Sequence, residues 1–412
     1  MKYGLIGQRL GHSFSAEIHK QLFGYDYELL ELQPDQLASF LQRREFFGIN
    51  VTMPYKEAVI PYLDFVDDMA QKIGAVNTVI NRNGKLYGYN TDYLGLKALI
   101  DYAGISLKNK TVLVLGSGGT SRTAMAVAES LGARCCARVS RSVKEGCITY
   151  SEAEVLYSDA EIIINTTPCG MYPNIGESAV DLSDYPMLHG VIDVVYNPLR
   201  TKLICDAMAV GIPSIGGLYM LVAQAAFAGS LFSGQAVTMA EIDTVYKQLV
   251  ALKQNIVLIG MPGCGKTTVG KLLSRATCMD FVDTDEVVVS VEGRSITDIF
   301  SSDGEAYFRE AESAVIQQLS TYQGFVIATG GGAVLEPKNV SLLRENGRIY
   351  FLDRSLEHLV VTDDRPLSST NEALEQLFKE RYAVYGAACD CHIDANQSIE
   401  DVLRQIREDL VT

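Results

Sequence analysis

The sequence predicts an α/β protein with more than one domain, and three observations support this fold class. Short runs rich in β-branched residues, such as "KYGLIG" and "GINVTM", alternate with helical stretches at 16–23 and 35–43. Two buried strands, "TVLVLG" and "NIVLIG", each lead through a glycine-rich turn into a helix. The chain has 412 residues, which is more than one hydrophobic core usually organises, so two or three domains are expected.

The first part of the chain is expected to form two α/β domains. Residues 1–94 and 217–252 are assigned to the first, where "GAVNTVINRNGKLYGYNTD" continues the pattern of short strands separated by Gly and Asn. Residues 95–216 are assigned to a doubly wound, Rossmann-type sheet, because the strand "TVLVLG", the helix "SRTAMAVAESLG" and the strand "RCCARVS" make one βαβ unit. The segments "EIIINTTP" and "GVIDVVYNP" add further buried strands.

A third α/β module is expected over residues 253–412. The amphipathic helix "MAEIDTVYKQLVALKQ" runs almost directly into the strand "NIVLIG", so the linker before this module is short. The module continues with "MDFVDTDEV", the helix "GEAYFREAESAVIQQLS", the strand and turn "FVIATGGGAV", the strand "RIYFLD" and a closing helix.

Composition excludes several classes of protein. Hydrophobic residues make up 48% of the chain and charged residues 21%, which is typical of a globular protein, and the net charge of −15 argues against a broad basic surface for nucleic acid. Nine Cys without a CxxC pair, and no apolar signal-peptide core, predict a cytoplasmic protein with reduced thiols. The segment "CDCH" lacks partners at zinc-finger spacing, so no metal is expected there.

An uncharged run at 207–240 raises the question of a membrane span. Its glycines, Pro213, Gln224 and Gln235 argue against one. The expected structure is a loop followed by a buried helix that begins near Gly217, and no membrane partner is predicted.

The first glycine loop, "GSGGTSR", lies between a strand and a helix, where helix N–H groups can bind a pyrophosphate. It departs from the dinucleotide pattern at the third small position, and a plain strand-to-helix turn is the alternative. Arg141, with Lys144 nearby, lies at the end of the next strand, where a cation favours NADP(H) over NAD; a solvated basic pair is the alternative. The candidate cofactor contacts are Gly116, Gly118, Gly119, Ser121, Ser140, Arg141 and Gly217.

Polar residues follow the short strands of the N-terminal region, in "GHSFS", "NVTMPYKE", "AVNT" and "NTD". Hydroxyls, amides, a Lys and an Asp in such loops suit a polyhydroxylated acid. Lys56 can give or take a proton at a substrate hydroxyl if Asp92 orients it and offsets its charge, so these two are the candidate catalytic pair.

These segments, with "GYNTD", "GSGGTSR" and "GGLYMLVAQAA" in this order, resemble shikimate dehydrogenase over residues 1 to about 250. The resemblance implies that Lys56 and Asp92 are the catalytic pair. It implies substrate contacts at Ser13, Ser15, Thr52, Asn77, Tyr196 and Gln224. Two departures are noted. Ser140-Arg141-Ser142 stands where the family usually has Asn-Arg-Thr, and Tyr219 replaces a small residue beside the expected nicotinamide pocket.

The second glycine loop, "GMPGCGKT", fits the phosphate-loop pattern G-x-x-x-x-G-K-[ST]. Lys266 is expected to neutralise phosphates and Thr267 to offer an oxygen to Mg²⁺. The nucleotide contacts are placed at Gly260, Gly263, Cys264, Gly265, Thr267 and Thr268. Guanidinium groups suit a carboxylate on a small ring, and Arg309 and Arg381 are the candidates, with a surface charge as the alternative for each. Gly330, Gly331 and Gly332 are expected to bring backbone N–H groups close to ring hydroxyls.

The segments "VDTDEV", "FREAE", "ATGGGAV", "RPL" and "KERYAVYGAA" resemble shikimate kinase over about 255–410, which implies a P-loop, NMP-kinase-like α/β/α domain. By that resemblance Asp283 holds Mg²⁺ through water, Asp285 contacts the attacking hydroxyl, and Arg365 belongs to a mobile lid. Only "TDD" separates the expected helix "SLEHLVV" from "RPL", whereas the family normally has a longer, basic segment there, so a shorter lid is expected.

Taken together, the sequence predicts a bifunctional enzyme that uses NADP(H), ATP and Mg²⁺, with 3-dehydroshikimate and shikimate as substrates. The oligomeric state is not indicated. One alternative is an NAD-linked quinate/shikimate dehydrogenase fused to the kinase of another small hydroxy acid, such as gluconate. A second is a non-catalytic sensor of the same intermediates.

Overall fold

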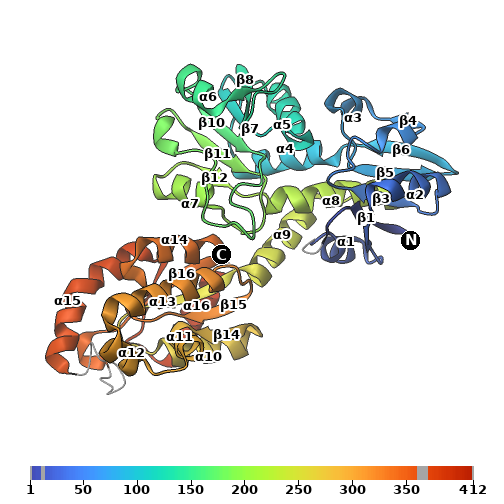
Figure 1. Cartoon of the computed structure of the whole chain (residues 1–412). Coiled ribbons are helices and arrows are strands. Elements are labelled where there is room, and N and C mark those ends of the chain that lie inside the picture. The colour runs from blue at the N-terminus through green and yellow to red at the C-terminus, as the bar shows by residue number, and fades with distance from the viewer. Residues whose placement is uncertain (1, 11–13, 360–369, 411–412) are drawn as a thin grey trace. The chain divides into compact units, whose positions relative to one another are not determined.

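The computed structural model describes residues 2–10, 14–359 and 370–410 (Figure 1). Its contacts divide the chain into two compact units, each described here by itself. The first unit consists of Met1–Met171, Glu177–Asn197 and Asp206–Gln248, and the second of Tyr172–Gly176, Pro198–Cys205 and Leu249–Thr412. The boundaries predicted near residues 94 and 216 fall inside the first unit and stay a prediction.

The first sheet of the first unit has six strands in the order β2-β1-β3-β5-β6-β4. β1 is parallel to β2 and β3, whereas β5 is antiparallel to both β3 and β6. The β5–β6 hairpin turns at Asn83 and Gly84, which both have positive φ, as a two-residue turn that follows the twist of the strands requires. The strands are Tyr3–Gly7, Glu28–Glu31, Gly48–Val51, Phe65–Val66, Thr78–Arg82 and Lys85–Tyr89 for β1 to β6.

Helices α1 (Ser15–Phe23), α2 (Leu37–Arg43) and α3 (Asp68–Ile73) accompany this sheet, with short 3₁₀ turns at Pro34–Gln36 and Ile60–Tyr62. The predicted stretches 16–23 and 35–43 are therefore helical, apart from the 3₁₀ start of the second. The core between them is apolar and includes Ile6, Leu41, Ile49, Val79 and Leu86.

The second sheet is fully parallel, in the order β12-β11-β10-β7-β8-β9. The chain runs from β7 to one edge and then returns to the other side of β7, so the glycine turn after β7 lies where the strand order reverses, the usual ligand position in such sheets. The strands are Thr111–Leu115, Cys135–Ser140, Ile148–Thr149, Ile162–Asn165, Gly190–Asp193 and Ser214–Ile215 for β7 to β12. Their helices are α5 (Gly119–Ser130), α6 (Tyr150–Leu156) and α7 (Lys202–Ala209), with a 3₁₀ turn at Leu182–Asp184.

Three longer helices complete this part of the chain: α4 (Thr91–Ala103), α8 (Leu218–Ser233) and α9 (Met239–Lys253). The uncharged run thus contains a buried helix that begins after Gly217, as predicted, but the stretch expected as a loop before it also holds the end of α7 and the short strand β12. Within the described residues, no helix has the length and apolar character that a membrane span needs. α4 and α8 pack closely because Gly95 has no side chain: a Cβ there would lie 2.8 Å from the carbonyl oxygen of Met220.

The sheet of the second unit is also parallel, in the order β14-β15-β13-β16-β17. All five strands end at the same edge, so the loops that follow them meet there. The strands are Asn255–Ile259, Asp280–Asp283, Phe325–Ala328, Gly347–Asp353 and Cys391–Asp394 for β13 to β17. The helices are α10 (Lys266–Thr277), α11 (Thr284–Glu292), α12 (Ile296–Ser302), α13 (Gly304–Leu319), α14 (Pro337–Asn346), α15 (Asn371–Ala388) and α16 (Ile399–Leu410), with 3₁₀ turns at Ala333–Leu335 and Leu356–His358.

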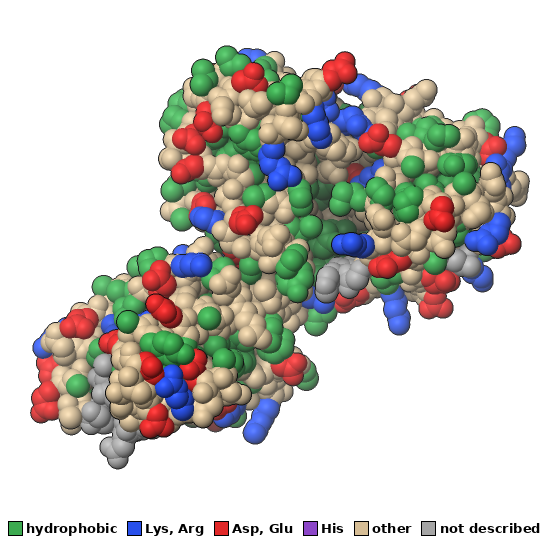
Figure 2. Space-filling view, in the orientation of Figure 1, with side chains coloured by type: hydrophobic (Ala, Val, Ile, Leu, Met, Phe, Trp, Pro, Cys, Tyr) green, Lys and Arg blue, Asp and Glu red, His purple; other side chains and the backbone are tan. Residues whose placement is uncertain are grey.

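The charged surface is mixed. Figure 2 shows acidic and basic side chains intermingled on the visible face of the described residues. An anionic ligand of this chain, whose net charge is −15, therefore has to be bound by individually placed cations.

Candidate active sites

Lys56 and Asp92 form an ion pair in the first unit. Lys56 Nζ lies 2.5 Å from Asp92 Oδ2, and both side chains are largely buried. Asp92 stands in the first turn of α4, whose N-terminus is capped by the Asn90 side chain accepting from Tyr93 N–H. The helix N-terminus favours a carboxylate at this position.

Asn77 completes this cluster. Its Nδ2 donates to Asp92 Oδ1 at 2.8 Å, and its Oδ1 accepts from the Thr91 backbone N–H at 2.7 Å. Because a backbone N–H can only donate, the amide of Asn77 has one orientation, with its N–H group directed at Asp92. Three of the predicted residues thus meet at one point.

Buried side chains behind Asn77 were missed by sequence reasoning. Thr78 Oγ1 lies 3.1 Å from Asn77 Oδ1, and Asn50 Nδ2 donates to Thr78 Oγ1 at 3.0 Å. Tyr27 O–H then donates to Asn50 Oδ1 at 2.7 Å. Asn50 and Thr78 belong to the quoted segments "NVTMPYKE" and "AVNT", so the signal was present but was assigned only to their neighbours.

The other predicted substrate contacts are more dispersed. Gln224 lies on α8, which packs against α4. A Cβ built on Gly95 of α4, one turn after Asp92, would be 2.8 Å from the Cβ of Gln224. Tyr196 packs beside Phe14, with ring centroids 5.6 Å apart, and burial raises its pKa. Ser15 is buried at the start of α1, and Thr52 follows β3. Ser13 lies outside the described residues.

The glycine loop after β7 has the backbone that a tight turn needs. Gly116 has φ +124°, and a Cβ there would meet Thr166 Oγ1 at 2.4 Å. Gly118 is the N-cap of α5 and Gly119 its first residue, so N–H groups of the helix terminus are presented there. The Ser121 hydroxyl donates back to Gly118 O at 2.7 Å and so supports the loop.

Two cations follow β8. Arg141 is exposed directly after Ser140, and Lys144 Nζ donates to Ser117 Oγ of the glycine loop at 2.9 Å. Lys144 therefore lies beside the loop, and the assignment of Arg141 and Lys144 to an extra phosphate on NADP stays a prediction. Packing also requires a glycine at position 217, since a Cβ on Gly217 would lie 2.1 Å from Val194 O.

The side chain of Tyr219 packs against two other tyrosines. Its ring stacks on Tyr102 with centroids 4.1 Å apart and meets Tyr246 edge-on at 5.2 Å. Its hydroxyl donates to Asp243 Oδ1 of α9 at 2.6 Å. The side chain that replaces a small family residue thus connects α8 to α4 and α9.

The phosphate loop follows β13 in the second unit. Gly260, Gly263 and Gly265 all have positive φ, and α10 begins at Lys266. Lys266 Nζ donates to Gly260 O at 2.8 Å and to Met261 O at 3.0 Å, so its ammonium is held within the loop. Cys264 is buried and Thr268 is exposed.

The predicted magnesium ligands are adjacent. Thr267 Oγ1 donates to Asp283 Oδ2 at 2.7 Å, and Asp283 Oδ1 accepts from the Asp285 backbone N–H at 3.0 Å. A hydroxyl and a carboxylate are hard oxygen donors of the kind that Mg²⁺ prefers when phosphate and water complete its shell. The donor set therefore fits this ion.

The glycine turn after β15 collects the remaining kinase residues. A Cβ on Gly330 would lie 2.5 Å from Asp285 Oδ1, and one on Gly332 would lie 2.2 Å from Arg309 Nη1. Gly331 lies against Pro262 of the phosphate loop, and its carbonyl oxygen accepts from Arg381 Nη1 at 3.2 Å. Asp285, both arginines and the phosphate loop are thus brought together by this glycine turn at one edge of the sheet, although they come from four separate segments.

Glu312 is a further member that sequence reasoning missed. Its Oε2 accepts from Arg309 Nη1 at 2.7 Å, and a Cβ on Gly330 would lie 2.4 Å from its Oε1. The side chain is 1% exposed, and this burial raises the pKa of its carboxyl above the ordinary value, although Arg309 opposes the effect. Its position three residues after Arg309 in "FREAE" was the available signal.

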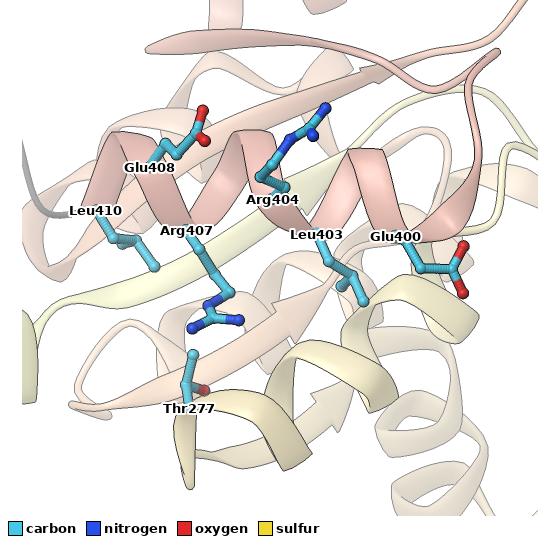
Figure 3. A pocket seen from close by; sticks show the side chains of 7 residues that line it. All are labelled: Thr277, Glu400, Leu403, Arg404, Arg407, Glu408 and Leu410. Atoms are coloured by element: carbon cyan, nitrogen blue, oxygen red, sulfur yellow. The ribbon is translucent and has the colours of Figure 1, made fainter.

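Two other features concern the same unit. The described residues contain a groove between α16 and the end of α10 (Figure 3), and none of the predicted site residues lines it; its lining is Thr277, Glu400, Leu403, Arg404, Arg407, Glu408 and Leu410. Arg365, the predicted lid residue, lies outside the described residues.

Comparisons with known proteins find relatives for both parts of the chain. A family model for the shikimate dehydrogenase substrate binding domain matches residues 5–79, and one for shikimate kinase matches residues 262–411. Shikimate dehydrogenase (NADP(+)) of Clostridium perfringens is 36% identical over 265 residues, which cover 60% of this chain and 97% of the relative.

Solved structures are similar over the same region. Shikimate dehydrogenase 1 from Peptoclostridium difficile matches with a TM-score of 0.56 and 34% identity over 60% of this chain and 98% of its own. The Thermus thermophilus enzyme, in complex with NADP(H) and shikimate, matches with a TM-score of 0.55 and 29% identity over 60% and 99%. The chain therefore belongs to the shikimate dehydrogenase family and carries, after that region, a shikimate kinase domain.

Proposed function

We propose that this chain catalyses two consecutive reactions: reduction of 3-dehydroshikimate to shikimate with NADPH, and transfer of a phosphoryl group from ATP to the 3-hydroxyl of shikimate. The observation that carries the proposal is the presence, in one chain, of the Lys56–Asp92–Asn77 cluster and of a glycine turn that joins Asp285 and two arginines to a phosphate loop.

In the reduction, NADPH supplies a hydride to the carbonyl carbon. The carbonyl oxygen then needs a proton, and Lys56 Nζ, held by Asp92 at 2.5 Å, is placed to give it. Asn77 keeps Asp92 oriented, and Ser13, Ser15, Thr52, Tyr196 and Gln224 are assigned to the carboxylate and the other ring hydroxyls. Arg141 and Lys144 are assigned to the 2′-phosphate of the cofactor.

In the phosphoryl transfer, ATP supplies the group that moves and Mg²⁺ offsets its charge. Arg309 and Arg381 hold the shikimate carboxylate, which directs the ring so that its 3-hydroxyl faces Asp285. Asp285 accepts a hydrogen bond from that hydroxyl and orients it for attack. Lys266 and the N–H groups at the start of α10 hold the phosphates. Thr267 and Asp283 are the oxygens assigned to the metal.

A substrate comparison tests the proposal. The purified chain is offered shikimate or quinate with NADP or NAD, and then shikimate or gluconate with ATP and Mg²⁺. We expect oxidation of shikimate with NADP and phosphorylation of shikimate. Preference for quinate with NAD, or for gluconate with ATP, would support the alternative fusion. Ligand-induced stabilisation without any turnover would support a sensor.

A further inference from the structure

Arg354 lies beside the phosphate loop without belonging to the predicted nucleotide contacts. It is the first residue after β16, at the edge of the sheet where the phosphate loop also lies. A Cβ built on Gly265, the residue directly before Lys266, would be 3.8 Å from Arg354 Nη1. The guanidinium group is therefore close to the last glycine of the loop, where N–H groups turn toward a bound phosphate.

The backbone around Arg354 is held in place. The neighbouring carboxylate of Asp353 accepts from the Tyr382 hydroxyl at 2.9 Å. Ser355 N–H donates to Asn396 Oδ1 at 2.8 Å, and His358 Nδ1 lies 3.2 Å from the same oxygen. The loop after β16 is thus tied to the loop after β17, and Arg354 starts from a fixed position.

The cation of Arg354 has no counter-charge among the residues that the structure describes. Its Nε is buried and forms no hydrogen bond with them. Other arginines of the same unit behave differently, since Arg309, Arg344 and Arg348 each pair with a carboxylate. A buried N–H group without a partner is unfavourable, and an incoming anion relieves that cost.

We propose that Arg354 is a phosphate contact of the bound nucleotide. The inference rests on the proposed kinase function. The guanidinium donates to a phosphate oxygen near Gly265, whereas the Lys266 ammonium is held by the carbonyl oxygens of Gly260 and Met261. Two cations of different kinds then share the triphosphate. The alternative is that Arg354 is an ordinary surface arginine whose guanidinium contacts no ligand.

Binding of ADP without shikimate tests this assignment apart from turnover. Isothermal titration of the full chain is performed for the wild type, Arg354→Ala and Arg354→Lys, with Arg404→Ala as the control, because exposed Arg404 pairs with Asp401 on α16. We expect Arg354→Ala to weaken ADP binding by about tenfold, Arg354→Lys to weaken it less, and the control to match the wild type. Binding of ADP by Arg354→Ala within about twofold of the wild type would overturn the proposal.

Inorganic tripolyphosphate distinguishes a phosphate contact from a contact with the nucleoside. If Arg354 contacts phosphate, Arg354→Ala weakens tripolyphosphate and ADP by similar factors. Unchanged tripolyphosphate binding with weakened ADP binding would place the contact on the base or ribose and overturn the assignment. Because Arg354 belongs to the second unit, thermal unfolding of the same preparations checks that this unit is folded in each variant. A wild type that binds no ADP would contradict the kinase function itself and not the role of Arg354.

Discussion

At the scale of single residues, the candidate kinase site includes a buried carboxylate that pairs with one of its two arginines. Glu312 is buried, and Arg309 is its cationic partner. Arg309 also contacts Glu305 at 2.9 Å, but that carboxylate is exposed. Buried pairs of this kind orient a guanidinium much more strongly than exposed ones, because water does not screen them.

We expect Glu312→Gln to raise the KM for shikimate by about threefold to tenfold, because the neutral amide holds Arg309 less firmly. Glu305→Gln is the matched control and should change this KM little. Steady-state kinetics of both variants, with ATP saturating, measure the difference. Equal effects of the two substitutions would contradict a special role for the buried carboxylate.

The same substitution has a pH signature. Burial raises the pKa of Glu312 in the folded chain, so the folded state holds this proton more tightly than the unfolded state. The contribution of Glu312 to stability is therefore present below the ordinary pKa of 4.5 and is lost as pH rises through the higher folded value. Thermal unfolding between roughly pH 5 and 8 should show Glu312→Gln gaining stability relative to the wild type as pH rises.

At the scale of elements, the glycine turn after β15 allows carboxylates and guanidinium groups to approach the backbone. Gly330 has no room for a methyl group, because Glu312 and Asp285 lie within 2.5 Å of a built Cβ. Gly386, in the last turn of α15, has nothing within 4 Å of its built Cβ. Packing therefore requires a glycine at position 330 but not at position 386.

Gly330→Ala should lower kcat/KM for phosphorylation by at least about tenfold, since Asp285 and Glu312 must move away from the turn. Gly386→Ala should leave activity unchanged and stabilise the unit by about 0.5–1 kcal/mol, because Ala is the better helix former. Kinase assays and chemical unfolding of the two variants provide the comparison. Full activity of Gly330→Ala would contradict the tight approach.

Helices and strands could be predicted where the pattern lies in neighbouring residues of the sequence. The strands before both glycine loops, the helix after each and the buried helix at Leu218–Ser233 follow from runs of neighbouring residues. The meeting of Asp285, Arg309, Gly330 and Arg381 has no such signal, because it depends on the order of parallel strands. Arg354 was missed for this reason, since a single Arg after a strand has no meaning until β16 is placed beside β13.

At the scale of the whole molecule, the two reactions use separate sets of residues in one chain. Lys56→Ala should lower dehydrogenase kcat by about 100-fold or more and leave phosphorylation intact, because it removes the proton donor. Lys266→Ala should do the reverse, by a similar factor, because it removes a charge from the phosphate loop. Separate assays of the two reactions in each variant decide the matter. Loss of both activities from either substitution would contradict independent sites.

The contacts of Tyr219 with Tyr102, Tyr246 and Asp243 limit where the chain can be divided into separately expressed dehydrogenase and kinase halves. Only Gln254 stands between the end of α9 and the start of β13. A stop codon placed before Met239 would remove Asp243 and Tyr246, leaving the buried Tyr219 hydroxyl without its acceptor. Such a fragment should aggregate on expression, whereas one that ends after Lys253 keeps the acceptor and should remain monodisperse in size-exclusion chromatography.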